Sequence, residues 1–455
     1  MAKNKKYTAK TRNLGKQVFI VSLGCPKNFV DTEVMAGSLL QSGQFSLTFN
    51  QAEADVMLIN TCAFLPSARQ ETYDTIKEAV AWKQRRPQNR KIVVAGCLIQ
   101  WDKEQNFKTD FPEVDVWNGI DGVSNIAEVL TGGHAEVRNF ADSPCYIYNE
   151  NTARLQLTLP HVAYLKVSDG CDNRCSYCSI PNIRGKLRSR TLESCLKEAD
   201  NLLSSGVKEI VLIAQDITAY GQDNDRGDTL AKLLTELDKR PGKFWIRLLY
   251  THPAHYTDEL IAVMQKSTHV VPYVDIPLQH IADNILLRMG RKATKADVMT
   301  VLTKLRQAMP DIAIRTTFIT GFPGETEADF NELKELITDF KFERFGVFAY
   351  AAEPRTPAAL MPNQIAGELA EQRATELMEI QRKISLAHNQ SLIGKTLTVL
   401  LDEADGKNGA GRAYLDAPEI DNYIFVHSTC NLNAGEFYQV EITDAEEYDL
   451  HGTVN

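Results

Sequence analysis

The amino-terminal part of the chain alternates short runs of β-branched residues with stretches of helical periodicity. These runs predict three strands with two amphipathic helices between them, at about 18–23, 28–42, 55–60, 67–85 and 91–95. Alternation of strand and helix is typical of a parallel sheet, because each helix returns the chain to start the next strand in the same direction. We therefore predict an open parallel α/β sheet over residues 17–137. Periodicity is lost over 138–158, which we interpret as a linker.

Residues 159–390 repeat the order strand then helix six times. The expected strands are Val162–Val167, Glu209–Gln215, Phe244–Tyr250, Tyr273–Pro277, Ile312–Ile319 and Phe345–Ala349. One helix is expected from Thr326 to Phe340, where Thr326 and Asp329 form a capping start and an apolar stripe follows. Six such units predict an incomplete parallel barrel, (β/α)6, whose chemistry lies on loops at the carboxyl ends of its strands.

Residues 391–455 alternate in the manner of short antiparallel strands separated by glycines. The expected strands are Leu397–Leu401, Ala413–Leu415, Ile424–Val426 and Tyr438–Ile442. This pattern is typical of a small five-stranded barrel. The predicted fold class is therefore α/β, with an open parallel sheet, an incomplete barrel and a small antiparallel β-barrel, preceded by a basic flexible tail at 1–16.

Composition and charge limit the function classes. The chain has 455 residues, 44% hydrophobic and 24% charged, without an apolar run near the roughly 20 residues that a bilayer span requires. Residues 1–13 lack the apolar stretch of a secretory signal, so we expect a cytoplasmic protein with no membrane partner.

The net charge of −9 resides entirely in one segment. Residues 392–455 contain three basic residues and twelve acidic ones. An acidic module is poorly suited to phosphate backbones and suits a basic protein surface instead. A solvated acidic face that aids solubility explains the charge equally well.

Six of the nine cysteines form two sets of three. In the first set, Cys25, Cys62 and Cys97 each follow one of the strands expected in the amino-terminal sheet. In a reducing compartment, clustered cysteines are metal ligands more often than disulfides. Because ligands bind at the carboxyl ends of strands in such sheets, these thiols are expected to converge. The alternative is three small buried thiols at the end of a sheet.

The second set is a tight loop, Cys171, Cys175 and Cys178, in the pattern C-x3-C-x2-C after the first barrel strand. Three thiolates on one loop can bind three irons of a cubane iron–sulfur cluster and leave the fourth iron without a protein ligand. A zinc site is the alternative, but structural zinc usually takes four protein ligands, and no fourth cysteine or histidine lies nearby. The other cysteines, Cys145, Cys195 and Cys430, are expected to be plain thiols.

The C-x3-C-x2-C loop resembles that of the radical S-adenosylmethionine (SAM) family. The resemblance implies that the open iron chelates the amino and carboxylate groups of SAM, and that the deoxyadenosyl radical formed abstracts a hydrogen atom. It also implies that polar groups near the strand ends hold the cofactor. The residues expected there are Tyr177, Gln215, Arg247, Gln279 and Thr317. The alternative for each of these residues is that it is an ordinary buried polar residue of the barrel interior with a structural role.

Six spaced cysteines and three domains in this order resemble the methylthiotransferases, which carry an amino-terminal cluster domain, a radical SAM barrel and a carboxyl-terminal TRAM domain. The resemblance covers nearly the whole chain and implies two [4Fe-4S] clusters and SAM as cofactors. The cluster on Cys25, Cys62 and Cys97 would carry the sulfur, and the two clusters would face a shared cavity. The implied reaction replaces C–H by C–S–CH3. It requires no general base, so no catalytic side chain is assigned.

Two subclasses of that family modify different substrates. The stretch Ser22–Asn28, SLGCPKN, resembles the subclass that modifies the β-carbon of an aspartate in ribosomal protein S-twelve. The implied partners are that protein or the small ribosomal subunit, together with an electron donor and a sulfur donor of unknown identity; direct nucleic-acid binding is secondary. The alternatives are the subclass that modifies a tRNA adenosine, a non-catalytic iron–sulfur sensor and a zinc-dependent RNA-binding module.

Overall fold

A computed structural model describes residues 15–132, 137–141 and 143–454. The chain divides into two compact units, and the first runs to Tyr146 and includes Asn151–Leu155. The second contains Ile147–Glu150 and Gln156 onward. Residues 1–14 of the expected basic tail lie outside the described residues. Among the residues described, no helix is both long enough and apolar enough to span a membrane.

The first unit contains a six-stranded sheet in the order β2-β1-β3-β4-β5-β6, and every pair is parallel. The strands are β1 (Lys16–Ser22), β2 (Phe45–Leu47), β3 (Val56–Thr61), β4 (Lys91–Gly96), β5 (Val116–Asn118) and β6 (Val137–Arg138). The three strands expected from the sequence are confirmed within about two residues, whereas the short strands β2, β5 and β6 were not expected. They are too short to show a period of two.

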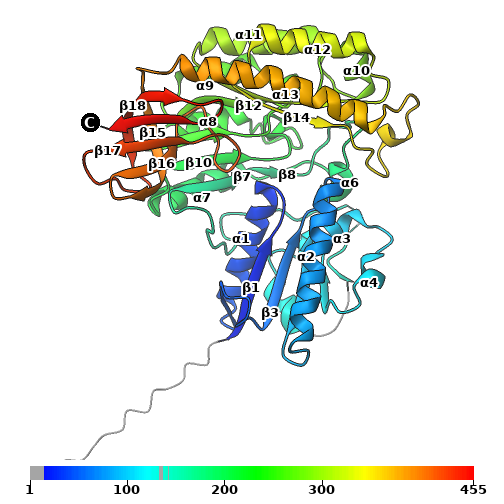
Figure 1. Ribbon diagram of the computed structural model, residues 1–455. Helices are drawn as coiled ribbons and strands as arrows, with labels where there is room; N and C mark the ends of the chain where they lie inside the picture. Colours follow the sequence, from blue (N-terminus) through cyan, green and yellow to red (C-terminus); the bar gives the residue numbers. More distant parts are fainter. Residues whose placement is uncertain (1–14, 133–136, 142, 455) are drawn as a thin grey trace, which may run out of the picture. The chain divides into compact units, whose positions relative to one another are not determined.

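Helices flank this sheet: α1 (Pro26–Gln41), α2 (Pro66–Gln84), α3 (Cys97–Trp101), α4 (Phe107–Asp110) and α5 (Ile126–Thr131), with a 3-10 turn, η1 (Ile120–Gly122). Figure 1 shows α1 and α2 lying along β1 and β3. All six residues of β3 are buried. This explains why β3 is almost continuously apolar rather than alternating, as parallel strands covered on both faces are.

The second unit contains a parallel sheet of six strands in the order β14-β13-β12-β11-β10-β7. The strands are β7 (Val162–Lys166), β10 (Glu209–Ile213), β11 (Trp245–Leu248), β12 (Val270–Asp275), β13 (Ala313–Thr320) and β14 (Arg344–Ala349). A two-stranded ribbon, β8 (Ser168–Asp169) and β9 (Arg188–Ser189), lies outside it. All six expected strands are present, but β12 begins three residues earlier than expected, at Val270.

Helices cover the outer face of this sheet and bury the apolar residues of its strands. The helices of this unit are α6 (Ile180–Arg184), α7 (Leu192–Ser204), α8 (Leu230–Leu237), α9 (Asp258–Lys266), α10 (Asp283–Arg288), α11 (Lys295–Ala308), α12 (Glu327–Phe340) and α13 (Gly367–Gln390), with 3-10 turns η2 (Ile217–Ala219), η3 (Pro253–His255) and η4 (Pro357–Leu360). Those whose apolar residues join the core of the sheet are α7, α8, α9, α11, α12 and α13. The capping box expected at Thr326 and Asp329 is confirmed at the start of α12.

The carboxyl-terminal strands close into a five-stranded barrel, as expected, in the order β15-β16-β17-β19-β18. They are β15 (Thr396–Asp405), β16 (Asn408–Arg412), β17 (Ile424–Ser428), β18 (Phe437–Ala445) and β19 (Leu450–Val454), drawn in orange and red in Figure 1.

One expected strand of this barrel, Ala413–Leu415, is wrong. The segment follows β16 without pairing, and Arg247 of β11 donates hydrogen bonds to the carbonyl oxygens of Ala413 and Tyr414. Its burial therefore comes from contact with the parallel sheet rather than from a strand partner.

Candidate metal centres

The first set of cysteines lies at one edge of the amino-terminal sheet. Strands β1, β3 and β4 are neighbours and run parallel, so their carboxyl ends meet there. Cys25 directly precedes α1, Cys62 follows β3, and Cys97 begins α3 after β4. Cys62 and Cys97 are buried, and Cys25 is half-buried. The strand pattern therefore correctly placed three thiols, from residues far apart in the sequence, at one edge.

Two glycines let the loops at this edge approach one another closely. Gly24 has φ +88°, and a Cβ atom built there would lie 2.9 Å from the Sγ atom of Cys62. Gly96 has φ +96°, and its Cβ would lie 2.3 Å from the Oδ1 atom of Asn60. Only glycine takes both the left-handed backbone and the close contact without strain. The residue before Cys25 thus packs directly against the side chain of Cys62.

A set of hydrogen bonds holds the three loops together. The amide of Asn28 donates to the carbonyl oxygens of Leu23 at 2.7 Å and of Thr61 at 3.3 Å. The hydroxyl of Thr61 donates to the carbonyl oxygen of Ala95 at 2.6 Å, and the N–H of Leu98 donates to that hydroxyl at 3.2 Å. The sequence indicated Asn28 only as part of SLGCPKN. The structure gives it a role in fixing the Cys25 loop against the end of β3.

The second set lies on the loop after β8, and the barrel holds this loop at several backbone points. The N–H of Cys171 donates to the carbonyl oxygen of Gly185 at 3.1 Å, and that of Ser176 donates to Met289 at 2.8 Å. Ser176 in turn accepts from the N–H of Ala358 at 2.8 Å. The loop is thus fixed before any ligand binds, which is what a metal site built on a rigid scaffold requires.

Burial keeps two of the thiols on this loop protonated until a metal binds. Burial raises the pKa of the Cys178 thiol to about 12 and that of Cys171 to about 11. Such thiols ionise only when a cation binds beside them, and they release their protons as it does. The guanidinium of Arg291 lies 4.0 Å from the Sγ atom of Cys175. Three half-buried thiols on one fixed loop therefore fit an iron–sulfur cluster.

Four of the expected cofactor residues lie toward the same end of the barrel. Tyr177 lies between two of the cysteines in the sequence, and its ring packs edge-to-face with that of Phe322, with the ring centroids 6.3 Å apart. Gln215 follows β10 and donates to Asp169 at 2.9 Å, while its Oε1 atom is buried and has no hydrogen-bond partner among the residues that the structure describes. An unsatisfied buried carbonyl oxygen is costly unless a donor arrives. This environment suits a ligand that brings an N–H group.

Gln279 and Thr317 are neighbours near the ends of β12 and β13. The N–H of Gln279 donates to the carbonyl oxygen of Thr317 at 2.8 Å, and the carbonyl of Gln279 accepts from Ile319 at 2.7 Å. Gln279 has φ +73°, which is uncommon outside glycine and costs free energy. Both side chains are half-buried.

Arg247, the fifth expected residue, lies elsewhere. Its Nε atom donates to Glu209 at 2.6 Å and its Nη1 atom to the carbonyl oxygen of Tyr414 at 2.6 Å. Glu209 is the first residue of β10, so these contacts lie at the amino end of the sheet. The guanidinium is fully engaged away from the cysteine loop, and this placement favours a structural role.

The sequence pointed only weakly to a group of polar residues beside Cys171. Asp216 accepts from the amide of Asn173 at 2.7 Å and pairs with Nδ1 of His255 at 2.8 Å. The rings of His252 and His255 stack with their centroids 5.0 Å apart. A cavity of about 100 Å³, lined in part by Cys171, Asp216 and His255, lies here. The sequence signal for this group is the position of its members: Asp216 follows β10, and His252 and His255 follow β11. Loops after the strands of such a barrel commonly carry its reacting groups.

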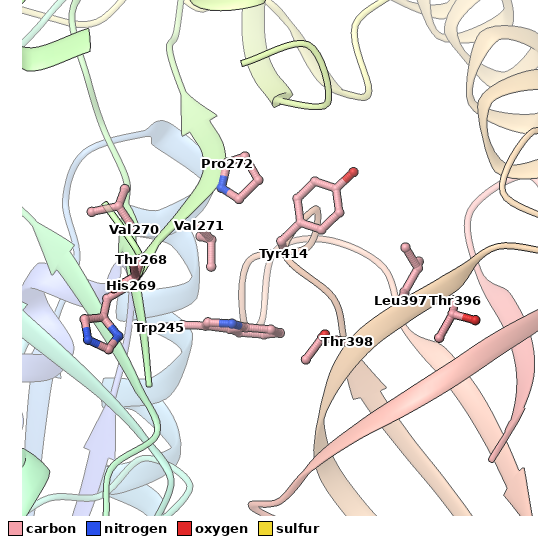
Figure 2. Close-up of a pocket in the computed structure, with 10 residues that line it drawn as sticks. All are labelled: Trp245, Thr268, His269, Val270, Val271, Pro272, Thr396, Leu397, Thr398 and Tyr414. Carbon is pink, nitrogen blue, oxygen red and sulfur yellow. The ribbon is translucent and has the colours of Figure 1, made fainter. Parts of the chain in front are cut away.

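A second cavity, of about 280 Å³, lies at the amino end of the same sheet, between the sheet and the carboxyl-terminal barrel (Figure 2). Figure 2 shows Trp245 and Pro272 of the parallel sheet together with Tyr414 and Thr398 around it. Trp245 begins β11, whereas the cysteine loop follows β7 and β8. This cavity therefore does not belong to the site formed by the cysteines.

Comparisons with known proteins agree with this layout. Three family models match in order: the uncharacterized protein family UPF0004 over residues 17–119, the radical SAM superfamily over 165–337 and the TRAM domain over 393–454. The chain is similar to proteins named ribosomal protein uS12 methylthiotransferase RimO. The protein of Desulforamulus reducens is 45% identical, and the match covers 95% of this chain and 98% of that protein. The protein of Akkermansia muciniphila is 44% identical, and the match covers 95% of this chain and 98% of that protein.

A solved structure shares the fold. The radical SAM methyltransferase TsrM from Kitasatospora setae is 14% identical, with a TM-score of 0.56 covering 79% of this chain and 78% of that one. The radical SAM match implies a [4Fe-4S] cluster and SAM as cofactors. The C-x3-C-x2-C loop lies within the matched range, and its three half-buried thiols are a donor set that such a cluster takes.

Proposed function

The chain belongs to the family of ribosomal protein uS12 methylthiotransferases, which are radical SAM enzymes, and on this premise we propose that it replaces a C–H bond by C–S–CH3 on the β-carbon of an aspartate in uS12. The observation that carries this proposal is the pair of cysteine sets. One set occupies a single fixed loop after the first barrel strand, and the other gathers the ends of three adjacent strands.

Cys171, Cys175 and Cys178 would hold the cluster that binds SAM. When bound, that cluster supplies the electron that cleaves SAM and so generates the radical that abstracts hydrogen. The protein's contribution is to keep the loop in place and to leave one coordination position open. Tyr177, Gln215, Gln279 and Thr317 would contact the cofactor. The unsatisfied Oε1 atom of Gln215 supports its part in this set.

Cys25, Cys62 and Cys97 would hold a second [4Fe-4S] cluster, which carries the sulfur to be transferred. The close packing of Gly24 on Cys62 and the hydrogen bonds of Asn28 support a site whose loops are held together before the cluster binds. The proposed reaction also requires an electron donor and a sulfur donor, and it defines only the chemistry of these partners.

The charge of the carboxyl-terminal barrel favours a protein substrate over tRNA. Residues 392–455 hold three basic and twelve acidic residues, and the exposed acids among them outnumber the exposed bases. Such a surface attracts a basic ribosomal protein and repels a phosphate backbone. SLGCPKN around Cys25 supports the same choice. A tRNA adenosine remains the alternative substrate to test.

The test is mass spectrometry of uS12 from cells with and without this gene. We expect one aspartate to be heavier by one methylthio group only when the gene is present. Unchanged uS12 accompanied by altered tRNA nucleosides would replace the protein substrate by tRNA. A cluster protein that leaves both substrates unchanged and does not consume SAM would be a sensor instead.

A further inference from the structure

The segment that runs from the last residue of β16 toward β17 contacts every strand of the parallel sheet in the second unit. We call residues 412–421 the plug segment. Each of the six strands contributes one side chain to it: Tyr164 to Glu419 at 3.3 Å, Glu209 to Arg412 at 2.6 Å, Arg247 to the carbonyl of Tyr414 at 2.6 Å, Tyr273 to Asp421 at 2.7 Å, Arg315 to Asp421 at 3.3 Å and Arg344 to Asp416 at 2.9 Å. The carboxyl-terminal barrel is therefore attached along the whole width of the sheet.

These six side chains lie on the inner face of the sheet. Their neighbours along the strands, such as Leu165, Ile210 and Val274, belong to the apolar core beneath the helices. Successive side chains of a strand point to opposite faces, so the contacting residues point away from the helices. The plug segment thus fills the inner face at the amino ends of the strands, while the cysteine loop lies at the carboxyl ends.

One contact of the plug segment continues toward the cofactor end. Asp421 binds the Nε atom of Arg315, and the Nη1 atom of the same guanidinium donates to Asp275 at 2.9 Å. The other oxygen of Asp275 accepts from the N–H of Tyr250 at 3.1 Å. Tyr250 follows β11 and has φ +65°, a conformation that costs free energy unless its surroundings enforce it.

The segment that begins at Tyr250 leads to the cysteine loop. The hydroxyl and N–H of Thr251 donate to the carbonyl oxygen of Asp275 at 2.7 and 2.9 Å. Four residues later, His255 pairs with Asp216, which accepts from Asn173 within the C-x3-C-x2-C loop. Polar contacts therefore connect the carboxyl-terminal barrel with the loop that would bind the cluster.

We propose that Asp421 is a positioning residue for the cofactor end of the barrel, and that it acts through Arg315 and Asp275 on the segment 250–255. A guanidinium that bridges two carboxylates has a fixed plane, so it transmits the position of one carboxylate to the other. The carboxyl-terminal barrel then has a role inside the radical SAM domain in addition to any contact with the substrate. The inference relies on the proposed function only for the identity of the cofactor bound at that end.

The first test measures hydrogen exchange by mass spectrometry on the reconstituted protein. Asp421→Asn keeps the shape and removes the charge that holds Arg315. We expect the amide hydrogens of the peptide 248–253 to exchange about tenfold faster, because the loss of one hydrogen bond changes an equilibrium by about that factor. The exchange rates of the amides in α12 should not change. The matched control is Asp405→Asn, which removes one exposed charge from the same barrel and should change neither peptide. Equal acceleration in α12, or no acceleration at 248–253, overturns the proposal.

The second test measures formation of 5′-deoxyadenosine from SAM without any protein substrate. Arg315→Lys provides a second variant should Asp421→Asn fail to fold, because one ammonium cannot bridge both carboxylates. In either variant we expect the KM for SAM to rise about five- to tenfold, with kcat within about twofold. An unchanged KM in a folded variant refutes the positioning role. Neither test uses uS12, so an unmodified uS12 would refute the proposed substrate and leave this inference standing.

Discussion

Arg412 is the residue whose removal should most weaken the attachment of the carboxyl-terminal barrel. Its side chain is 1% exposed and lies between two carboxylates. It binds Asp402 at 2.7 and 2.9 Å and Glu209 at 2.6 Å. Arg412→Met keeps most of the side-chain length but leaves these buried acids with one cation fewer. Breaking a buried ion pair by removing one partner costs about 3–5 kcal/mol, so we expect a loss in that range.

The matched control is an exposed ion pair in the same unit. Lys239 lies 2.6 Å from Glu236 and its side chain is 61% exposed. Exposed pairs contribute about 0–1 kcal/mol, so Lys239→Met should change the free energy of unfolding by less than about 1 kcal/mol. Urea unfolding read by hydrogen exchange assigns each transition to peptides of the second unit. That assignment matters because a chain of two units need not unfold in one step.

The effect of Arg412→Met should depend on pH. Burial raises the pKa of the Glu209 carboxyl, but Arg412 and Arg247 outweigh burial and hold this pKa below its ordinary value of 4.5. A carboxyl with a lowered native pKa stabilises the fold above its unfolded pKa, and this contribution is lost as the pH falls through the native pKa. The difference between wild type and variant should therefore be full at pH 7 and shrink below about pH 4.5. A difference under about 1 kcal/mol at pH 7, or one that widens in acid, would refute this reasoning.

Three further predictions concern the cysteine sets and a half-buried histidine. Cys175→Ala should abolish SAM cleavage, whereas Cys62→Ala should retain some cleavage and form no methylthio product; full activity in both would contradict the two-cluster proposal. Gly24→Ala places a methyl group 2.7 Å from the Cβ of Cys62, so iron should fall from about eight toward about four per chain, whereas Gly43→Ala, at a similar positive φ with open space, should keep its iron. Burial, with nearby cations, lowers the pKa of His388 to about 4. As the pH falls from 6.5 to 4, the free energy of unfolding of the wild type should therefore decrease by about 1–3 kcal/mol more than that of His388→Gln. Urea unfolding at each pH measures this difference, and equal decreases would show that His388 does not contribute.

The placement of Cys25, Cys62 and Cys97 at one edge of the sheet could be predicted from the sequence, because it depends on a local rule. Each of these thiols lies within three residues of the carboxyl end of a strand, and parallel strands bring their carboxyl ends to one edge whatever the distance in sequence. The close packing at that edge could not be predicted in the same way. Gly24 is an ordinary turn residue in the sequence, and only the fold places Cys62 against it.

The plug segment could not be predicted from its pattern. Ala413 and Leu415 are buried apolar residues around a tyrosine, and the same alternation describes both a paired strand and a segment buried against another domain. Arg247 misled for a related reason. A buried arginine on a barrel strand suggests a contact with a ligand. Its actual partner is the carbonyl oxygen of Tyr414, 167 residues away, and nothing in the sequence around Arg247 indicates that contact.

These contacts also change what the acidic charge of the last segment can do. The carboxylates of Asp402, Asp416 and Asp421 pair with arginines within the second unit, so these charges are not presented to a partner. Exposed acids of the same segment include Glu403, Asp405, Glu436, Glu441 and Asp444, and its exposed cations are Lys395 and Lys407. The outer surface thus keeps an acidic surplus, but a smaller one than the composition suggests. Attraction of a basic protein by exposed charges is screened by salt, so this surplus should act mainly on the association rate and weaken as ionic strength rises.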